Sequence, residues 1–445
     1  MRRTPCGSRG FATLMVFAVI ALAAIIIGMI QTSAFGQASA GRESLARVRA
    51  QWAARAGLES MIATLEWSTE NPDMGSAFTL MDDFVAVSTG DLEGATYRVA
   101  TFEESREVLG PADAHSKLNI NRLTKDQLLM IEPLMSEDVA DSILDWIDSD
   151  DDTNPLGAEI GYYAGLPYPY EPRNAPMRSI LEMELVAGVD ARDVRGEDWN
   201  LNGLLDPNED DGDESWPPDN ADGILDRAWS GVLTASSLEG ALAPSGQPKI
   251  DLQNADAGEL VQRAKVDSNQ AQAIVDYVAN NSGATMRDFI IRDLRQLAQQ
   301  NGGGGGGGQT VRIENLTREQ LGLLLDEATV GAPESGAHIP GKLNINTCPA
   351  KTLEYLPQIT PEVADAIIAE RSARPDGFVS LADLLGVPGI GRRQLAAIYE
   401  LLCVRSNVYE VTCRGRDLRT GIETEIHAVL DRSTLPVVLQ EVSVR

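Results

Sequence analysis

The stretch RGFATLMVFAVIALAAIIIGMI, residues 9–30, decides the fold because it contains no charged residue after Arg9. A helix over residues 11–30 would be about 30 Å long, which matches the hydrocarbon thickness of a bilayer. Arg2, Arg3 and Arg9 lie before or at its start, and the positive-inside tendency predicts that they stay in the cytoplasm. We therefore expect the bulk of the chain outside the cytoplasm.

Three interpretations of this segment compete. It is long enough for a permanent membrane anchor, and Ala38-Ser39-Ala40 could serve as the cleavage site of a signal peptide. Alternatively, the short basic leader, Gly10, Phe11 and the apolar helix resemble the class III leader of type IV pilins and type II secretion pseudopilins. That resemblance implies a leader of residues 1–10, cleavage by a prepilin peptidase between Gly10 and Phe11, and methylation of the new amino terminus.

Met15 is a departure from the major pseudopilins, which carry a glutamate as the fifth residue after the cut. In those subunits the carboxylate pairs with a neighbouring subunit's terminal amine. An unpaired carboxylate would be costly in hydrocarbon, so a subunit with nothing above it has no use for one. By resemblance, its absence is typical of the large minor subunit K at the tip of the pseudopilus.

The helix is predicted to continue beyond the membrane to residue 67. Residues 44–67 have apolar side chains at the spacing of one helical face, with arginines and glutamates elsewhere. We expect this face to pack on a globular head, although an amphipathic helix that merely covers its own domain would show the same pattern. The residues of the predicted face are Leu45, Val48, Trp52, Ala56, Leu58 and Ile62.

Charge and length limit the class of protein. The chain has 445 residues, with 37 basic and 66 acidic side chains and a formal charge of −29. Such a surface repels nucleic acid, and the length suffices for two or three domains. Cys6 would leave with the leader, while Cys403 and Cys413 could form a disulfide in an oxidising compartment or remain free buried thiols.

Three similar segments begin at Lys117, Lys249 and Lys342. Each has a short extended start, a helix, a turn and a second helix. An asparagine in each segment is placed to cap the first helix or to close its turn, and two second helices have an N-cap residue followed by glutamate. These residues are Asn121, Asn254 and Asn346, and the pairs Ser136-Glu137 and Thr360-Glu362.

The sequence VPGIG, residues 387–391, matches the turn of DNA-binding helix-hairpin-helix motifs. In such motifs, backbone amides approach a phosphate and basic side chains hold it. Only Arg392 and Arg393 would support that contact here, against an acidic background. We therefore predict that the turn serves helix packing and that the chain does not bind nucleic acid.

The segment DWIDSDDDTNPLGAEIGYYAGLPYPYEPRNAPMRSILEMELVAGV, residues 145–189, is similar to the signature of the minor pseudopilin K family of type II secretion. The resemblance implies a single-pass inner-membrane protein with its bulk in the periplasm. It further implies minor pseudopilins I and J and other pseudopilins as partners, and a structural role at the tip that helps start pseudopilus assembly for protein export. The alternative is a membrane-tethered, calcium-dependent adhesion or scaffold protein.

The fold implied by the family is α+β. A pilin-like long N-terminal helix and an antiparallel sheet are interrupted by an inserted α-helical domain with helix-hairpin-helix (SAM-like) repeats. Residues 95–102, 407–416, 421–432 and 436–444 alternate as strands do. We therefore predict a head of residues 68–117 and 404–445, with residues 118–403 inserted between its two parts.

An acidic insertion, residues 190–230, contains DWNLNGLLDPNE at residues 198–209. This sequence fits an EF-hand calcium loop, with Gly203 at the sharp turn and oxygen ligands at Asp198, Asn200, Asn202, Leu204 (backbone), Asp206 and Glu209. An incomplete second loop offers Asn220, Asp222 and Asp226, and Asp145, Asp148, Asp150, Asp151 and Asp152 are further candidates. The alternative for the insertion is a solvated acidic segment without an ion.

The remaining features do not indicate catalysis. Residues 301–309 contain a glycine run that we expect to be a flexible linker. The three histidines, His115, His338 and His427, do not have metal-site or triad spacing, and no nucleotide-binding glycine loop is present. We therefore expect a protein that is not an enzyme.

Overall fold

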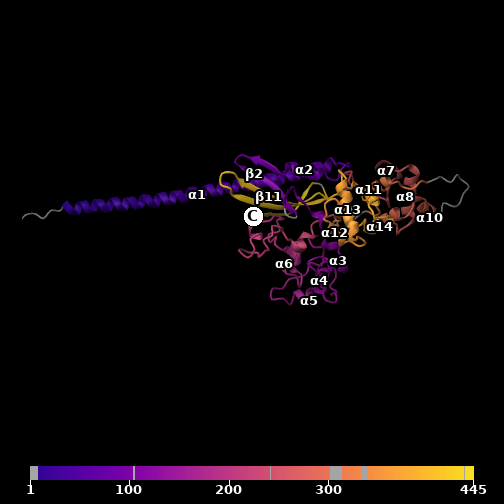
Figure 1. The fold of residues 1–445 in the computed structure, drawn as a ribbon, viewed down its shortest axis with the longest axis horizontal. Helices are drawn as coiled ribbons and strands as arrows, with labels where there is room; N and C mark the ends of the chain where they lie inside the picture. The colour runs from indigo at the N-terminus through magenta and orange to yellow at the C-terminus, as the bar shows by residue number, and fades with distance from the viewer. Residues whose placement is uncertain (1–8, 104–105, 241, 301–312, 332–338, 435) are drawn as a thin grey trace, which may run out of the picture.

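The computed structural model describes residues 9–103, 106–240, 242–300, 313–331, 339–434 and 436–445. One long helix, α1 (Arg9–Glu70), projects from the rest of the molecule (Figure 1). Its apolar part is long enough to cross a membrane, and none of it is buried in the protein. The predicted helix thus exists and ends three residues later than expected. Most of the predicted leader and the glycine linker lie outside the described residues.

The head contains a seven-stranded antiparallel sheet in which the two distant parts of the chain meet. The main order is β1-β2-β11-β12-β13, with β3 paired to β2 and β4 paired to β11. This confirms the predicted discontinuous sheet. Its strands are β1 (Thr89–Leu92), β2 (Ala95–Glu103), β3 (Arg106–Leu109), β4 (Ala112–Asp113), β11 (Val408–Asp417), β12 (Glu423–Asp431) and β13 (Val438–Val444).

The second half of α1 packs on β11, β12 and β2 through small residues. Ala50 and Ala54 are fully buried, and a Cβ at Gly415 would lie 1.9 Å from the carbonyl oxygen of Ala50. Only glycine allows the helix to approach β11 this closely. Larger residues (Leu58, Met61 and Leu65) continue the same face, and α2 (Thr79–Val87) packs beside it.

The predicted packing face of the stem was therefore partly wrong. Leu45, Val48 and Trp52 are 50%, 45% and 63% exposed, because alanines at neighbouring positions of the helix face the sheet instead. Leu58 is the member of the predicted set that is buried in the core. An apolar stripe of Leu45, Val48 and Trp52, called the stem stripe below, is left uncovered.

The inserted domain consists of three units that share one hydrophobic core. Each unit closes with a two-residue parallel strand pair, in which Leu118, Ile250 and Leu343 lie opposite Leu233, Ala328 and Leu402. The weak middle repeat is therefore a full unit. It lies at the end of the molecule farthest from α1, while unit 1 extends to one side of the molecule (Figure 1).

The elements of the units are as follows. After η1 (Ala114–Ser116), unit 1 contains β5 (Leu118–Asn119), η2 (Ile120–Arg122), α3 (Lys125–Leu128), α4 (Glu137–Ile147), α5 (Ile160–Tyr163), η3 (Ile180–Leu185), α6 (Ala191–Arg195), η4 (Pro207–Glu209), η5 (Ala228–Gly231) and β6 (Leu233–Thr234). Unit 2 contains β7 (Ile250–Asp251), α7 (Ala257–Arg263), α8 (Ser268–Asn280), α9 (Met286–Ile291), α10 (Leu294–Gln300), α11 (Arg318–Glu327) and β8 (Ala328–Thr329). Unit 3 contains β9 (Leu343–Asn344), α12 (Ala350–Glu354), α13 (Pro361–Ala373), η6 (Leu381–Gly386), α14 (Arg392–Ile398) and β10 (Leu402–Cys403).

Two of the three repeated asparagines, Asn121 and Asn346, hold distant segments rather than cap the first helix. Asn121 accepts from the backbone N–H of Met177 and donates to its carbonyl, and Asn346 makes the same two bonds to Phe378. The local turns are closed by the preceding asparagines, Asn119 and Asn344. Asn254 donates only to nearby Asp251. The predicted N-cap positions of α4 and α13 are confirmed, although neither side chain makes a capping bond to the helix backbone.

Candidate functional site

The predicted calcium loop closes on itself through hydrogen bonds, in which the side-chain amides of Asn200 and Asn202 donate to Oδ2 of Asp206 at 2.8 and 3.0 Å. Gly203 has φ +68°, as the sharp turn requires. Asp198 accepts from the N–H groups of Asn202 and Gly203 at 3.0 Å. Glu209 accepts from the N–H of Trp199 at 3.0 Å and that of Asp206 at 3.1 Å, so the twelfth residue returns to the start of the loop.

Burial makes this arrangement costly without a cation. Asp198 is 2% exposed and Glu209 is 1% exposed, and neither forms an ion pair with a lysine or arginine in the described part of the chain. Burial and then the charges of Asp198 and Asp206 raise the pKa of Glu209 to about 7. Burial also raises the pKa of Asp198. An all-oxygen donor set with two buried carboxylates fits a hard cation such as calcium.

The loop lies against the strands of the head. The Thr412 hydroxyl donates to the carbonyl oxygen of Asn202 at 2.6 Å, and the Phe102 N–H donates to that of Gly203 at 2.6 Å. Arg414 on β11 contacts both Asp206 and Glu425. The acidic insertion is therefore a structural connection between unit 1 and the head.

The second candidate loop is different. Asn220, Asp222 and Asp226 are exposed. Their side-chain oxygens accept backbone N–H groups two residues ahead, as in Asx turns. These three exposed side chains do not form a buried centre, and calcium binding there stays a prediction.

Of the five further candidate acids, Asp145 and Asp148 meet a third carboxylate within the described residues. Asp150, Asp151 and Asp152 are exposed. Sequence reasoning missed Glu159, which lies beside Asp145 and Asp148. The Gly-Ala-Glu step within residues 145–189 is the signal that could have drawn attention to it.

Cys403 and Cys413 do not form a disulfide. Both are free thiols, and they belong to different parts of the fold. Cys413 lies in the core between β11 and α1, whereas the sulfur of Cys403, on β10, is 3.9 Å from His115 Nδ1. Burial raises the pKa of Cys413 to about 12. The alternative of a free buried thiol therefore describes Cys413, whereas Cys403 is a free, half-buried thiol.

The glycine turn of unit 3 is used for packing. Gly389 has φ +88°, and a Cβ there would lie 3.1 Å from Val363 Cγ2 on α13. Gly188 in unit 1 has φ +82° and the same relation to Val139. Arg392, one of the two basic residues at this turn, donates to the carbonyl oxygen of Ile290. This matches the packing role predicted for the turn.

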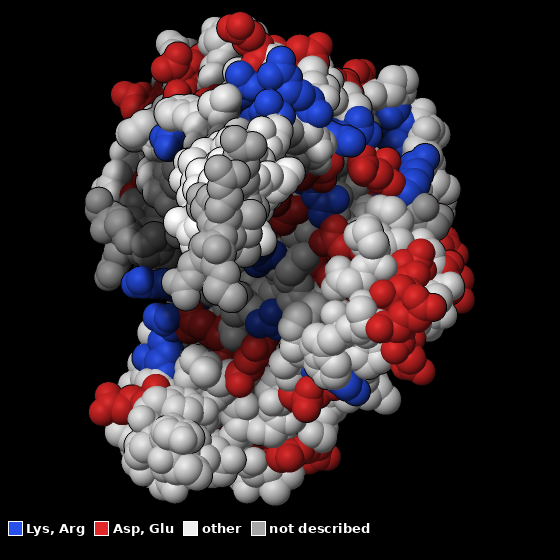
Figure 2. All heavy atoms as spheres, turned by 90° about the vertical axis from the view of Figure 1, so that its left-hand side faces the viewer, with Lys and Arg blue, Asp and Glu red and all other residues white. Residues whose placement is uncertain are grey.

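The long helix on an antiparallel sheet, with helical units inserted into it, defines a pilin-like subunit of α+β class. Acidic side chains are spread over the face seen along α1, from which the apolar helix projects toward the viewer (Figure 2). Residues 108–196 match the family model of type II secretion system (T2SS) protein K. Residues 340–403 match a helix-hairpin-helix motif. The predicted resemblance to minor pseudopilin K is thereby confirmed over residues 108–196.

Known proteins that are similar to this chain include two from type II secretion systems. Type II secretion system protein K of Klebsiella pneumoniae is 27% identical over 202 residues, which cover 41% of this chain and 59% of the relative. The crystal structure of the GspK-GspI-GspJ complex from the type 2 secretion system of enterotoxigenic Escherichia coli contains a chain with a TM-score of 0.42 and 14% identity. That similarity covers 91% of this chain and 99% of the other.

Proposed function

We propose that this protein is a structural minor pseudopilin at the tip of the type II secretion pseudopilus, where it helps start assembly for protein export. The observation that carries the proposal is α1, whose apolar first part is unburied while its second part packs on a pilin-like sheet. The family match of residues 108–196 favours this role over the adhesion or scaffold alternative.

In this proposal residues 11–30 span the inner membrane and the head lies in the periplasm. Prepilin peptidase cuts between Gly10 and Phe11, and the freed helix then packs against the helices of minor pseudopilins I and J. Mass spectrometry of the mature protein tests the first step. A methylated Phe11 at the amino terminus is expected, whereas an intact Met1 or a start at Gly41 would contradict the proposal.

The stem stripe is the surface that we assign to partner helices. Leu45, Val48 and Trp52 are exposed and apolar, and a second helix that covered them would remove this area from water. Trp52→Ala should reduce co-purification with minor pseudopilins I and J several-fold while leaving thermal melting unchanged, because the ring makes no part of the head core. Gln51→Ala, at an exposed neighbouring position, is the matched control.

Calcium at residues 198–209 would hold unit 1 on the head. Asp198, Asn200, Asn202, the carbonyl of Leu204, Asp206 and Glu209 would supply the oxygens, and the bound charge would offset the buried carboxylates. Calcium should raise the melting temperature of the chelator-treated protein by several degrees. Asp198→Asn should remove most of that rise, while Asp213→Asn, an exposed charge change in the same insertion, should retain it. Chelator-insensitive melting of the wild type would reject the site.

A further inference from the structure

A pocket of about 180 Å³ lies where the head meets units 2 and 3 of the inserted domain. Most of its lining comes from three segments, which are the end of α1 with the start of α2, residues 239–249 before β7, and residues 402–409. The last of these returns the chain from unit 3 to the head. The volume admits roughly a dozen water-sized groups, so the pocket is large enough for a small organic molecule.

Arg405, on the segment between β10 and β11, lines this pocket. Its Nη1 donates to the carbonyl oxygen of Asp73 at 2.5 Å, which holds the guanidinium in place. Nε and Nη2 are buried, and among the described residues they have no hydrogen-bond partner. These two nitrogens share one edge of the guanidinium, the arrangement that binds a carboxylate through two parallel hydrogen bonds. Because a buried donor without a partner is costly, this edge indicates an anionic ligand.

Lys249, the first residue of the middle repeat, supplies a second cation to the pocket. The corresponding lysines of the other two repeats are paired, since Lys117 lies 3.3 Å from Glu410 and Lys342 lies 3.4 Å from Glu239. Lys249 is half-buried, and within the described residues it forms neither an ion pair nor a hydrogen bond. Burial, and then the positive charge of Lys342, lower the pKa of Lys249. An anion in the pocket would supply the negative charge that the other two lysines obtain from glutamate.

Asp326, in the last turn of α11, is the acid of the pocket that could neutralise both cations without a ligand. Its charge acts on Arg405 and on Lys249, yet in the part of the chain that the structure describes it forms an ion pair with neither. Burial raises the pKa of Asp326 to about 7, so at neutral pH its carboxyl carries only part of a negative charge. A rotation of this side chain onto Arg405 is the competing account, and it predicts that no ligand binds.

The rest of the lining favours one class of anion. Asp83, Asp113 and Glu239 also line the pocket, so a dianion such as phosphate would be repelled more strongly than a single carboxylate. Leu80 and Leu242 provide apolar surface against which a hydrocarbon body can pack. Apolar walls with a small number of placed polar groups are typical of sites for small organic molecules.

We propose that this pocket binds an organic monocarboxylate. The carboxylate accepts hydrogen bonds from Nε and Nη2 of Arg405 and lies near Nζ of Lys249, while the apolar body packs against Leu80 and Leu242. A free organic acid and the carboxyl terminus of a peptide present this same group. Because Lys249 begins unit 2 and Arg405 lies on the return to the head, a bound ligand ties unit 2 to the head.

Isothermal titration calorimetry of the full-length protein in detergent tests this binding with hexanoate and with its neutral counterpart, hexanamide. Hexanoate should bind and hexanamide should not, because the amide lacks the charge. Arg405→Gln should weaken hexanoate binding by about tenfold or more, since two charge-assisted hydrogen bonds are lost. Lys249→Gln should weaken it several-fold. Arg393→Gln, which removes an exposed arginine of unit 3, is the matched control and should bind hexanoate as the wild type does.

A tripeptide with a free carboxyl terminus and the same tripeptide with a terminal amide distinguish the two sources of the carboxylate. Tighter binding of the free-acid peptide than of hexanoate identifies a peptide terminus, the reverse order identifies a free organic acid, and both results support the proposal. It is overturned if no carboxylate binds, if Arg405→Gln binds hexanoate as tightly as the wild type, or if phosphate binds more tightly than either carboxylate. If near-ultraviolet circular dichroism shows that Arg405→Gln does not fold, Lys249→Gln decides by the same criterion.

Discussion

Units 1 and 3 of the inserted domain share a framework but differ in their loops. In both units, an asparagine bonds to the backbone just before a 3-10 helix, which is η3 in unit 1 and η6 in unit 3. In both, a glycine with positive φ packs on a valine, which lies on α4 in unit 1 and on α13 in unit 3. The two units diverge at two places. Residues 148–179 of unit 1 correspond to 374–380 of unit 3, and residues 196–232 correspond to 399–401.

Each enlarged loop of unit 1 carries one of the two buried acidic centres. Glu159 lies in the first enlarged loop, and Asp198 and Glu209 lie in the second. Long loops in a compact domain must satisfy their backbone without regular structure, and a bound cation is one means of ordering them. In our proposal, unit 1 depends on bound calcium, whereas unit 3 is stable through its core alone.

The largest expected effect is therefore the removal of calcium. At a calcium concentration about 1,000-fold above Kd, each occupied site would contribute about 4 kcal/mol to the free energy of unfolding. Hydrogen exchange should show that chelation reduces protection of residues 198–209 by several hundred-fold. Residues 343–403 should be much less affected. Equal loss of protection in both units would break the proposed contrast.

The second prediction concerns what the units share. Asn346 is 6% exposed, and its amide makes bonds to the N–H and carbonyl of Phe378 and to the carbonyl of Val404. Asn346→Ala would leave these groups unpaired and should cost roughly 2–4 kcal/mol of stability, measured by urea unfolding. Asn121→Ala should cost somewhat less, because it is only half-buried.

Asn254→Ala is the control for this prediction because, among the described residues, the Asn254 side chain bonds to Asp251 within its own turn and to no distant segment. Its expected cost is below about 1 kcal/mol. If Asn346→Ala were no more destabilising than Asn254→Ala, the asparagine bonds to a distant backbone segment would not stabilise the framework that the units share.

The sequence predicts those parts of the molecule whose pattern is local. The strands of the head show the residue alternation of an antiparallel sheet in their sequence, and the calcium loop has its candidate ligands at fixed short spacing. The stem face was misjudged because hydrophobicity favours Leu45 and Trp52, whereas close approach to Gly415 requires the small side chains of Ala50 and Ala54. Size, rather than apolarity, selects the packed face.

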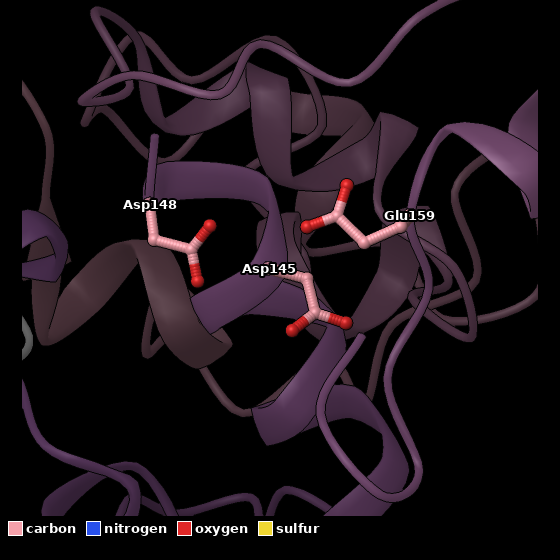
Figure 3. Close-up of side chains that lie close together, drawn as sticks. All are labelled: Asp145, Asp148 and Glu159. Carbon is pink, nitrogen blue, oxygen red and sulfur yellow. The ribbon is translucent and has the colours of Figure 1, made fainter. Parts of the chain in front are cut away.

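Glu159 could not be found by spacing alone. It is separated from Asp148 by a segment without regular structure, and only the tertiary path past Gly157 brings the two carboxylates together (Figure 3). The hydrogen bond from Asn121 to Met177 likewise joins residues that are distant in sequence. In both cases the contact is made with a segment that is distant in sequence, so the residues next to Glu159 or Asn121 in the sequence give no sign of it.

The smallest expected effect is a dependence on pH that distinguishes the two units. The pKa values of Glu159 and Glu209 in unit 1 are raised from 4.5 to about 7, mainly by burial. Without calcium, the folded protein therefore holds more protons than the unfolded chain between these values. Its stability is highest below about pH 4.5 with respect to these two groups and falls as the pH rises through 7. In unit 3, the hydrogen bond from Thr360 lowers the pKa of Glu362, so its contribution has the opposite sign.

Melting of the chelator-treated protein between about pH 5 and pH 8 measures this slope. The melting temperature should fall with rising pH, and Glu159→Gln and Glu209→Gln should each flatten the fall, because an amide does not ionise. Glu362→Gln should not flatten it. Added calcium should restore the melting temperature most at the high end of the range, where the Glu209 carboxylate is charged and binds the ion without first losing a proton. If neither glutamine variant changed the slope, the buried charge of the two glutamates would already be balanced within the protein. Unit 1 would then need no bound ion, as is the case for unit 3.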